Sequence, residues 1–291
     1  MTQDLPNRPQ VIASPLEENA VQDNPWQALR QFTQARIALG RVGVSLPTAP
    51  QLAFQLAHAQ ARDAVHLPLQ HETLAQQLAL GLTPLFTQAQ QAFQLLQLHS
   101  AARDRDEYLQ RPDLGRQLDV ASFAQLQTLD AQALKADLAI VIADGLSALA
   151  IQNHALPLLQ ALLPSLFQAD WRMAPLSIVR QGRVAIGDPI GCALQAEIVV
   201  VLVGERPGLS SPDSMGLYLT YAPRLGLSDA QRNCISNVRP AGLPFAEAAY
   251  KLHYLLQNAK QKKISGVALK DETLSQAPQM QMESNFLLVK E

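Results

Sequence analysis

The sequence predicts an α/β fold: a Rossmann-like, mostly parallel sheet with flanking helices, preceded by a small α-helical N-terminal domain. Two observations lead to this prediction. Helical periodicity dominates from about residue 25 to residue 110, whereas from about residue 130 to residue 262 short aliphatic runs alternate with helical segments. The clearest aliphatic run, at residues 198–203, has no polar alternation and is expected to form a strand buried on both faces.

Composition limits the classes of protein that fit. The chain has 291 residues, 48% of them hydrophobic, which is enough for one large domain or two ordinary ones. Charged residues make up only 16%, which fits a subunit that hides surface in a complex. The net charge of -2 gives no electrostatic reason to expect a nucleic acid or an anionic membrane as partner. Cys192 and Cys234 have no disulfide or metal spacing, so a reducing cytoplasm is the expected compartment.

We expect four regions along the chain. Residues 1–24 are polar and rich in Pro, Gln and Asn, and are predicted to be a disordered tail without a secretory signal. Residues 25–115 are expected to form the helical N-terminal domain, and residues 116–267 the Rossmann-like α/β domain. Residues 268–291 are predicted to be a polar C-terminal tail. No apolar run reaches the roughly 20 residues that span a membrane.

The N-terminal domain is expected to be helical throughout. Its helices are predicted at residues 25 to about 40, 49–65, 73–80 and 83 to about 98. Asn24 could cap the first, and Arg36 and Arg41 flank its terminal glycine turn, where they could bind an anion or simply be solvated. His58 and His66 have no geometric partner and are not expected to be ligands.

Charge is concentrated at residues 103–116. This segment is interpreted either as a salt-bridged linker between domains or as an interface loop in which Arg111, Asp113 and Arg116 fix the register by paired charges. A further helix is expected after it, through Leu129.

The second half is expected to alternate strands and helices. Strands are predicted at residues 137–143, 176–180, 198–203 and 217–222, with a short hairpin partner at 183–186; helices are predicted at 148–162, within 188–196, from 228 and from 243 to about 263. Residues 233–237 are expected to be a polar loop. Asp144 and Ser147 follow the first strand at the expected helix N-cap, and capping explains them at least as well as ligand binding does.

Glu205 and Arg206 lie on the turn that ends the strand at 198–203. In an open α/β sheet, ligands bind at the carboxyl ends of central strands, so this turn is a candidate cofactor or partner site. The alternative is an ordinary strand exit with a solvated Glu and Arg, since a fold alone does not define a function.

Several motifs of catalysis and nucleotide binding are absent from the sequence. No G-x-G-x-x-G follows a strand, and there is no P-loop, H-E-x-x-H or G-x-S-x-G. Cys234 could be a nucleophile, but no base can be paired with it. The residues alone therefore predict an α/β protein with a ligand at the strand ends and no visible catalytic machinery.

Six short motifs occur in an order and spacing that resemble the small (light) subunit of ethanolamine ammonia-lyase. The resemblance covers roughly residues 30–267. The motifs are A-R-I-A-L-G-R-V-G at 35–43, Y-L-Q-R-P-D-L-G-R at 108–116, I-A-D-G-L-S at 142–147, G-R-V-A-I-G-D at 182–188, L-V-G-E-R-P-G at 202–208 and C-I-S-N at 234–237.

The resemblance implies an adenosylcobalamin-dependent lyase that converts ethanolamine to acetaldehyde and ammonia by a radical mechanism. It implies that a large subunit performs the chemistry, that the small subunit helps bind cobalamin at the interface, and that six copies of each chain assemble. No independent active site is then expected here. In this family the cofactor keeps its own benzimidazole on cobalt, which would explain why the chain has no Asp-x-His-x-x-Gly motif.

The resemblance also implies which residues contact cobalamin: Val184, Glu205 and Cys234. Val184 would pack against the corrin or its amide arms, while Glu205 and the backbone around Cys234 could accept hydrogen bonds from propionamide groups. Arg206, Asp144 and Ser147 could line the same edge. No catalytic residue and no metal ligand is expected.

Two questions stay open at this point. Some family members carry an amphipathic N-terminal helix that targets a bacterial microcompartment; residues 1–24 show no such stripe, so a free cytoplasmic enzyme is expected. The alternatives to the cobalamin-binding subunit are a self-sufficient Rossmann-like nucleotide-binding enzyme, with Glu205 and Asp144 as acid and base, and a purely structural scaffold subunit.

Overall fold

The computed structural model describes residues 20–129 and 136–273. The chain divides into two compact units, Met1–Ala59 and Gln60–Glu291. Most of the N-terminal tail predicted at 1–24, and most of the C-terminal tail predicted at 268–291, lie outside the described residues.

In residues 20–59, the described part of the first unit, the chain forms a 3-10 helix and the start of a long helix. The 3-10 helix η1 is Pro25–Phe32, and Asn24 caps it by accepting a hydrogen bond from the Trp26 N–H at 2.9 Å. The helix expected to run to about residue 40 therefore ends early. The chain turns back instead, since Gln22 and Arg41 form an antiparallel bridge. Helix α1, Thr48–His66, begins in this unit and ends in the second.

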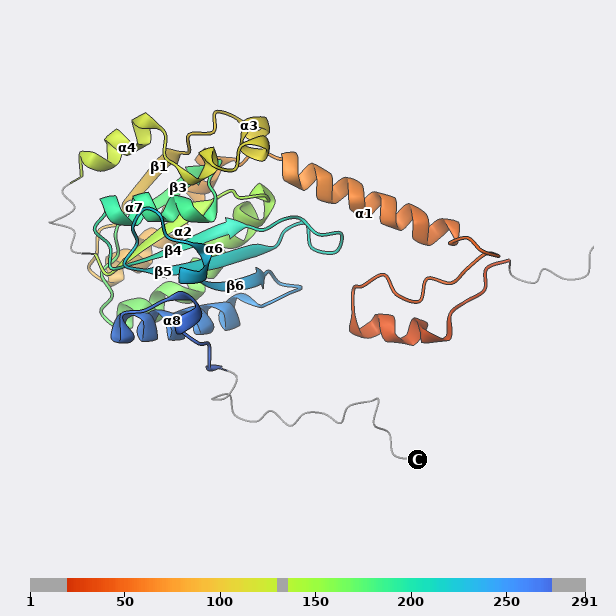
Figure 1. Ribbon diagram of the computed structural model, residues 1–291. Coiled ribbons are helices and arrows are strands. Elements are labelled where there is room, and N and C mark those ends of the chain that lie inside the picture. The colour runs from red at the N-terminus through yellow and green to blue at the C-terminus, as the bar shows by residue number, and fades with distance from the viewer. Residues whose placement is uncertain (1–19, 130–135, 274–291) are drawn as a thin grey trace, which may run out of the picture. The chain divides into compact units, whose positions relative to one another are not determined.

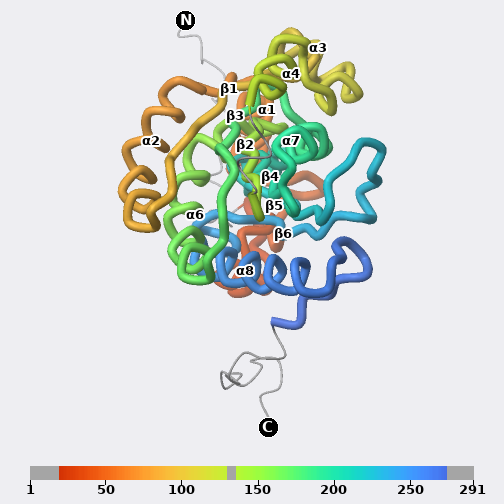
Figure 2. Tube along the Cα trace, turned by 90° about the vertical axis from the view of Figure 1, so that its left-hand side faces the viewer, coloured from red at the N-terminus to blue at the C-terminus, as the bar shows by residue number. Residues whose placement is uncertain are grey.

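The second unit, drawn as a ribbon in Figure 1, is built on a six-stranded sheet. The strand order is β1-β3-β2-β4-β5-β6, which can be followed in Figure 2. The strands are β1 Leu95–His99, β2 Leu138–Ala143, β3 Leu176–Arg180, β4 Ile198–Gly204, β5 Met215–Tyr221 and β6 Asn233–Val238. The first four strands in the spatial order are parallel, and β5 and β6 are added antiparallel. The predicted α/β class with a mostly parallel sheet is confirmed.

Helices cover both faces of the sheet, as Figure 2 shows. One face carries α2 His71–Gln88, α6 Ala148–Gln168 and α8 Phe245–Lys262; the other carries α4 Val120–Gln127 and α7 Gly187–Ala193. Side chains of β4 alternate between the two cores: Ile198, Val200 and Leu202 face one, and Val199, Val201 and Val203 face the other. This double burial explains why the strand has no polar alternation.

The remaining elements are short. They are α3 Arg105–Gln110, η2 Leu114–Arg116, η3 Val184–Ile186, η4 Asp229–Gln231 and η5 Gly266–Ala268. Within the described residues, none of the helices is both long and apolar enough to cross a bilayer.

The helices predicted at 73–80 and 83–98 are wrong in extent, because α2 is continuous from His71 to Gln88. Gly81 does not end the helix. A Cβ at this position would lie 2.8 Å from Leu156 Cδ1, so the glycine allows α2 to pack closely against α6. Residues 95–99 form a strand of the main sheet, paired in parallel with β3, within the segment expected to be helical.

Two further local predictions are wrong. Residues 183–186 turn into η3 instead of returning as a hairpin strand. Residues 233–237 belong to β6, an edge strand that pairs antiparallel with β5, and the side chain of Asn233 is bound to the segment after α8. Asn233 Nδ2 donates to the Leu269 carbonyl at 2.8 Å, and the Gly266 N–H donates to Asn233 Oδ1 at 2.7 Å.

Candidate ligand cleft at the carboxyl ends of the parallel strands

The carboxyl ends of β2, β3 and β4 meet at one edge of the sheet because the three strands are parallel neighbours. A cleft of about 410 Å³ opens at this edge. Its lining comes from the end of β4, from the turns after the three strands, from α3 and from β5. The lining residues are Tyr108, Gly145, Leu146, Arg183, Val184, Val203, Gly204, Glu205, Arg206 and Tyr218.

The turn after β2 is held against the end of β4 by direct backbone contact. Leu146 N–H donates to the Gly204 carbonyl at 2.8 Å. Gly145 has a φ of +58°, and a Cβ there would lie 2.2 Å from the Gly204 oxygen. A Cβ on Gly204 would lie 2.0 Å from the Ser147 oxygen. Only glycine fits at both positions, so the floor of the cleft is made of closely packed main chain.

Ser147 has the capping role that the sequence suggested, but Asp144 does not. Ser147 Oγ accepts from the Ala150 N–H at 3.2 Å and donates to the Pro212 carbonyl at 2.8 Å. Asp144 instead reaches across to the next strand, where its carboxylate accepts from the N–H groups of Gln181 at 2.9 Å and Gly182 at 3.0 Å. Asp144 therefore fixes the turn after β3 to the end of β2.

Asp144 is buried, with 2% of its surface exposed, and it is not among the lining residues of the cleft in the described chain. Burial raises the pKa of its carboxyl, while Arg105 and the amide donors oppose that shift. Arg105 Nη1 lies 3.8 Å from the carboxylate and donates to the Gly145 carbonyl at 2.7 Å. These contacts support a structural role, and they leave Asp144 unable to reach a ligand as an acid or base.

Tyr108 of α3 forms one wall of the cleft between two arginines. The guanidinium carbons of Arg183 and Arg105 lie 4.5 Å and 4.8 Å from its ring centroid. Its hydroxyl donates to the Gly182 carbonyl at 3.3 Å, and burial raises the pKa of that hydroxyl. Arg183 Nη2 donates to the Tyr108 carbonyl at 3.1 Å, whereas its Nε is buried without a hydrogen-bond partner among the described residues.

Glu205 is held by the residues around it before any ligand binds. Its Oε2 accepts from the Ser214 hydroxyl and from the Asn237 N–H, the latter at 3.1 Å. Its own N–H donates to the Ser214 carbonyl at 2.9 Å. Both side-chain bonds use Oε2, so Oε1 is the oxygen available to a further donor. Arg206, the next residue, is exposed at the rim.

Val184 and Cys234 differ in their relation to the cleft. Val184 begins η3, is half-buried and lines the cleft beside Glu205. Cys234 lies on β6 directly opposite Tyr218 of β5, and it is Tyr218 that lines the cleft. Desolvation by its neighbours raises the pKa of the Cys234 thiol, which makes it a poor nucleophile near neutral pH. The structure therefore brings Val184 and Glu205 together in the lining of the cleft, whereas Cys234 is an exposed residue beside Tyr218 and is not among the lining residues in the described chain.

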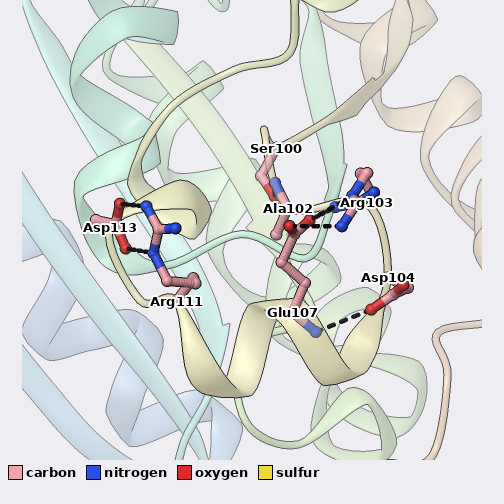
Figure 3. Close-up of polar contacts among 7 residues, drawn as sticks. All are labelled: Ser100, Ala102, Arg103, Asp104, Glu107, Arg111 and Asp113. Carbon is pink, nitrogen blue, oxygen red and sulfur yellow. Dashed lines mark hydrogen bonds and ion pairs between the residues drawn. The ribbon is translucent and has the colours of Figure 1, made fainter.

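The charged segment at 103–116 is organised by internal pairs, as Figure 3 shows. Asp104 caps α3 by accepting from the Glu107 N–H at 2.8 Å, and Arg103 Nη2 lies 3.1 Å from Glu107 Oε1. Arg111 and Asp113 form an exposed pair at 2.7 Å. The segment is therefore a capped helix and a 3-10 turn that place Tyr108; whether Arg111 and Asp113 also fix a subunit interface stays a prediction.

Sequence reasoning missed Tyr108 and Arg183 as lining residues. Both stand inside motifs of the family resemblance, in Y-L-Q-R-P-D-L-G-R and G-R-V-A-I-G-D. Tyr108 and Arg183 come together because α3 packs against the turn after β3, and a local sequence pattern cannot predict such packing. Within residues 20–129 and 136–273, no group of three or more His, Cys, Asp or Glu side chains is arranged to hold a metal ion.

The fold and the cleft define a class: an α/β protein with a doubly covered sheet and a cleft at the carboxyl edge of its parallel strands. Residues 23–270 match the model of the family described as "Ethanolamine ammonia-lyase light chain". This chain belongs to that family, as the resemblance had suggested.

Close relatives carry the same description. The chain is 58% identical over 271 residues to the "Ethanolamine ammonia-lyase small subunit" of Ralstonia nicotianae, covering 92% of this chain and 96% of that protein. It is 59% identical over 252 residues to the small subunit of Azotobacter vinelandii, covering 86% and 89%. Against the small subunit of Pseudomonas aeruginosa the identity is 53% over 279 residues, covering 94% and 97%.

Proposed function

We propose that this chain is the small subunit of an adenosylcobalamin-dependent ethanolamine ammonia-lyase, and that its cleft binds one edge of the cofactor at the interface with the large subunit. One observation carries the second part of the proposal: Val184 and Glu205, on the turns after β3 and β4, line the same cleft. The family membership of the chain supports the first part.

The chemistry of the cleft fits a corrinoid edge. The corrin rim carries amide arms that both donate and accept hydrogen bonds. Glu205 Oε1 can accept from an amide NH₂, and Arg206 and Arg183 can donate to amide carbonyls. Val184, Tyr108 and the main chain at Gly145 and Gly204 supply apolar contact and close approach. The cleft of about 410 Å³ is much smaller than the whole cofactor, which agrees with a site shared between two subunits.

Within this proposal, the residues of this chain bind and orient. Bound adenosylcobalamin supplies the radical chemistry that this chain does not supply itself. Glu205 holds an amide arm in one direction, because its own geometry is already fixed by Ser214 and Asn237. Val184 would pack against the macrocycle, and Cys234, which lies beside Tyr218 on the neighbouring strand, would contact the cofactor next to the Tyr218 ring. The large subunit holds ethanolamine and converts it to acetaldehyde and ammonia.

The test is reconstitution with a candidate ethanolamine ammonia-lyase large subunit. The two chains are co-expressed and co-purified, and adenosylcobalamin-dependent acetaldehyde formation is measured with each chain and with both. We expect activity only when both chains are present. If the chains do not co-purify, or if this chain alone binds nucleotides, the self-sufficient alternative replaces the proposal.

Glu205→Gln locates the cofactor site. The variant keeps the shape of Glu205 but removes the carboxylate that accepts an amide donor, so we expect the adenosylcobalamin dissociation constant to rise about tenfold. Glu247→Gln is the matched control, because Glu247 is on α8 and is paired with Lys251. An unchanged constant in Glu205→Gln would favour the structural scaffold alternative.

Stoichiometry and location are further parts of the proposal. Six copies of each chain are expected in the complex, which native mass spectrometry of the co-purified protein would count. A free cytoplasmic enzyme is expected in place of an encapsulated one. To distinguish the two, cells grown on ethanolamine are fractionated and the chain is detected with an antibody. A free enzyme stays in the soluble fraction, whereas an encapsulated one is recovered with the microcompartments.

A further inference from the structure

Glu205 begins a loop that joins β4 to β5, and a charge cluster with two buried members holds this loop at its other end. We call residues 205–214 the Glu205 loop; it extends beyond the carboxyl ends of the strands (Figure 1). The cluster consists of His154 on α6, Asp213 in the loop and Arg239 just after β6. His154 and Arg239 are 6% exposed each, so both are removed from solvent.

Asp213 accepts from both partners. His154 Nε2 lies 3.1 Å from Asp213 Oδ2, and Arg239 Nη1 lies 2.5 Å from Asp213 Oδ1. Arg239 also donates from Nη2 to the Ser210 carbonyl at 3.0 Å, which ties a second point of the loop to β6. Three elements that are separate in sequence therefore converge on one carboxylate.

The cluster is connected to the cleft through the next residue. Ser214 follows Asp213 directly and is 4% exposed. Its hydroxyl donates to Glu205 Oε2 and its carbonyl accepts from the Glu205 N–H at 2.9 Å. Ser147 Oγ holds the preceding Pro212 carbonyl at 2.8 Å. Any movement of Asp213 thus moves the group that orients the Glu205 carboxylate.

We infer that His154, Asp213 and Arg239 are positioning residues that preorganise Glu205 for its ligand. This inference rests on the proposed cofactor role of Glu205. None of the three is among the residues that line the cleft in the described chain, so they act on the ligand only through the Glu205 loop. A binding group that is held in place before the ligand arrives loses less conformational freedom on binding, which increases affinity.

The test uses the co-purified complex of both subunits. Asp213→Asn keeps the side-chain shape and removes the charge that pairs with Arg239. We expect the dissociation constant for adenosylcobalamin, and for cyanocobalamin as an inactive probe, to rise about tenfold, with kcat unchanged at saturating cofactor. Amide hydrogen exchange at residues 206–214 should become faster in the absence of cofactor. Arg239→Lys keeps a cation beside Asp213. It should therefore change the two cobalamin dissociation constants and the amide hydrogen exchange less than Asp213→Asn does.

Asp137→Asn is the matched control. Asp137 is also an ion-paired aspartate, with Arg172 and Lys260 as partners, and it is more deeply buried than Asp213, but it stands at the amino end of β2. We expect Asp137→Asn to leave the dissociation constants for adenosylcobalamin and cyanocobalamin unchanged. The amide hydrogen exchange of residues 206–214 should also stay unchanged. An equal effect of Asp137→Asn and Asp213→Asn would mean general destabilisation and would overturn the inference.

Glu205→Gln distinguishes a failure of the positioning inference from a failure of the proposed cofactor site. If Asp213 acts through Glu205, the double variant should bind cobalamin no more weakly than Glu205→Gln alone. If Glu205→Gln weakens binding and Asp213→Asn does not, the positioning inference fails while the proposed site stands. If neither variant changes the constant, the proposed site is itself wrong, and the inference falls with it.

Discussion

Gly204 occupies a position where no side chain fits, because the main chain of the turn after β2 passes over it. A Cβ would lie 2.0 Å from the Ser147 oxygen and 2.5 Å from the Asp144 oxygen, and both are backbone atoms that cannot rotate away. The contact joins the end of β4 to the turn after β2, and Gly204 is itself a lining residue of the cleft.

Gly204→Ala should therefore destabilise the fold by about 3 kcal/mol, the upper end of the usual cost of overpacking. Chemical denaturation of the purified chain measures this value. Gly226→Ala is the control: Gly226 has a φ of +86° but no atom within 4 Å of the added Cβ, so only the backbone cost of about 1 kcal/mol is expected. Equal losses in the two variants would show that the turn yields to the added methyl group.

Tyr108 contributes mainly through its ring, since two guanidiniums flank it and its hydroxyl makes a single bond at 3.3 Å. Tyr108→Phe should cost less than about 1 kcal/mol of unfolding free energy, whereas Tyr108→Leu should cost about 2–3 kcal/mol. The same denaturation measurement distinguishes them. If Tyr108→Phe lost more unfolding free energy than Tyr108→Leu, the stabilising contribution of Tyr108 would come from its hydroxyl and not from its ring.

At the scale of single residues, Val184 could be predicted only from its motif, whereas Glu205 was also indicated by its place on the turn that ends a buried strand. Physical reasoning from the sequence alone reached the turn after β4, because an aliphatic run followed by Gly204 is a local signal. It could not reach Tyr108 or Arg183, whose place in the cleft depends on how α3 packs over the turn after β3. Asp144 was misread as a possible cap because its true partners, Gln181 and Gly182, lie on another strand.

At the scale of elements, the Glu205 loop should respond to acid through Asp213. Burial alone would raise the pKa of Asp213, but the hydrogen bond from His154 and the charge of Arg239 outweigh it, so the pKa is lowered. A carboxyl of this kind stabilises the fold fully above its unfolded pKa of about 3.9, and the contribution is lost as pH falls through the folded pKa.

Asp213→Asn should thus cost about 2 kcal/mol of unfolding free energy at pH 6, and the difference from the unmodified chain should shrink below about pH 4. The value is reduced from that of a fully buried pair because the Asp213 side chain is 27% exposed. Denaturation curves at several pH values give the difference. The exposed Asp170→Asn serves as control, since asparagine tolerates the left-handed φ of 56° at that position. A difference that stays constant down to pH 3 would contradict the ion-pair explanation.

The strength of the local pattern decided which elements the sequence could predict. The strands β2, β3, β4 and β5 follow from runs of aliphatic residues, and α6, α7 and α8 follow from the helical segments between them. Strand β1 has only five residues and continues the apolar spacing of α2, so periodicity could not separate the two. Strand β6 buries only Ile235 and Val238, and an edge strand with so many polar residues resembles a loop.

At the scale of the whole molecule, the low share of charged residues supports a chain that is completed by a partner. Only 16% of the residues are charged, and large apolar side chains such as Val120, Leu80 and Leu225 are at least 74% exposed. Co-expression with the large subunit should therefore raise the soluble fraction of this chain several-fold, measured by centrifugation and quantitative immunoblotting. If the chain expressed alone stays monodisperse at the concentration reached by co-expression, its exposed apolar surface does not require the large subunit for solubility.

Strand β1 has a practical consequence for dividing the molecule. The sequence suggested that the α/β domain starts at residue 116, yet Leu95–His99 is the outermost strand beside β3. A fragment beginning at residue 116 would leave the N–H and C=O groups of β3 open along one side, and such an edge recruits strands from other copies. Truncation at that point should give aggregates, so the shortest form suited to expression or labelling must begin upstream of Leu95.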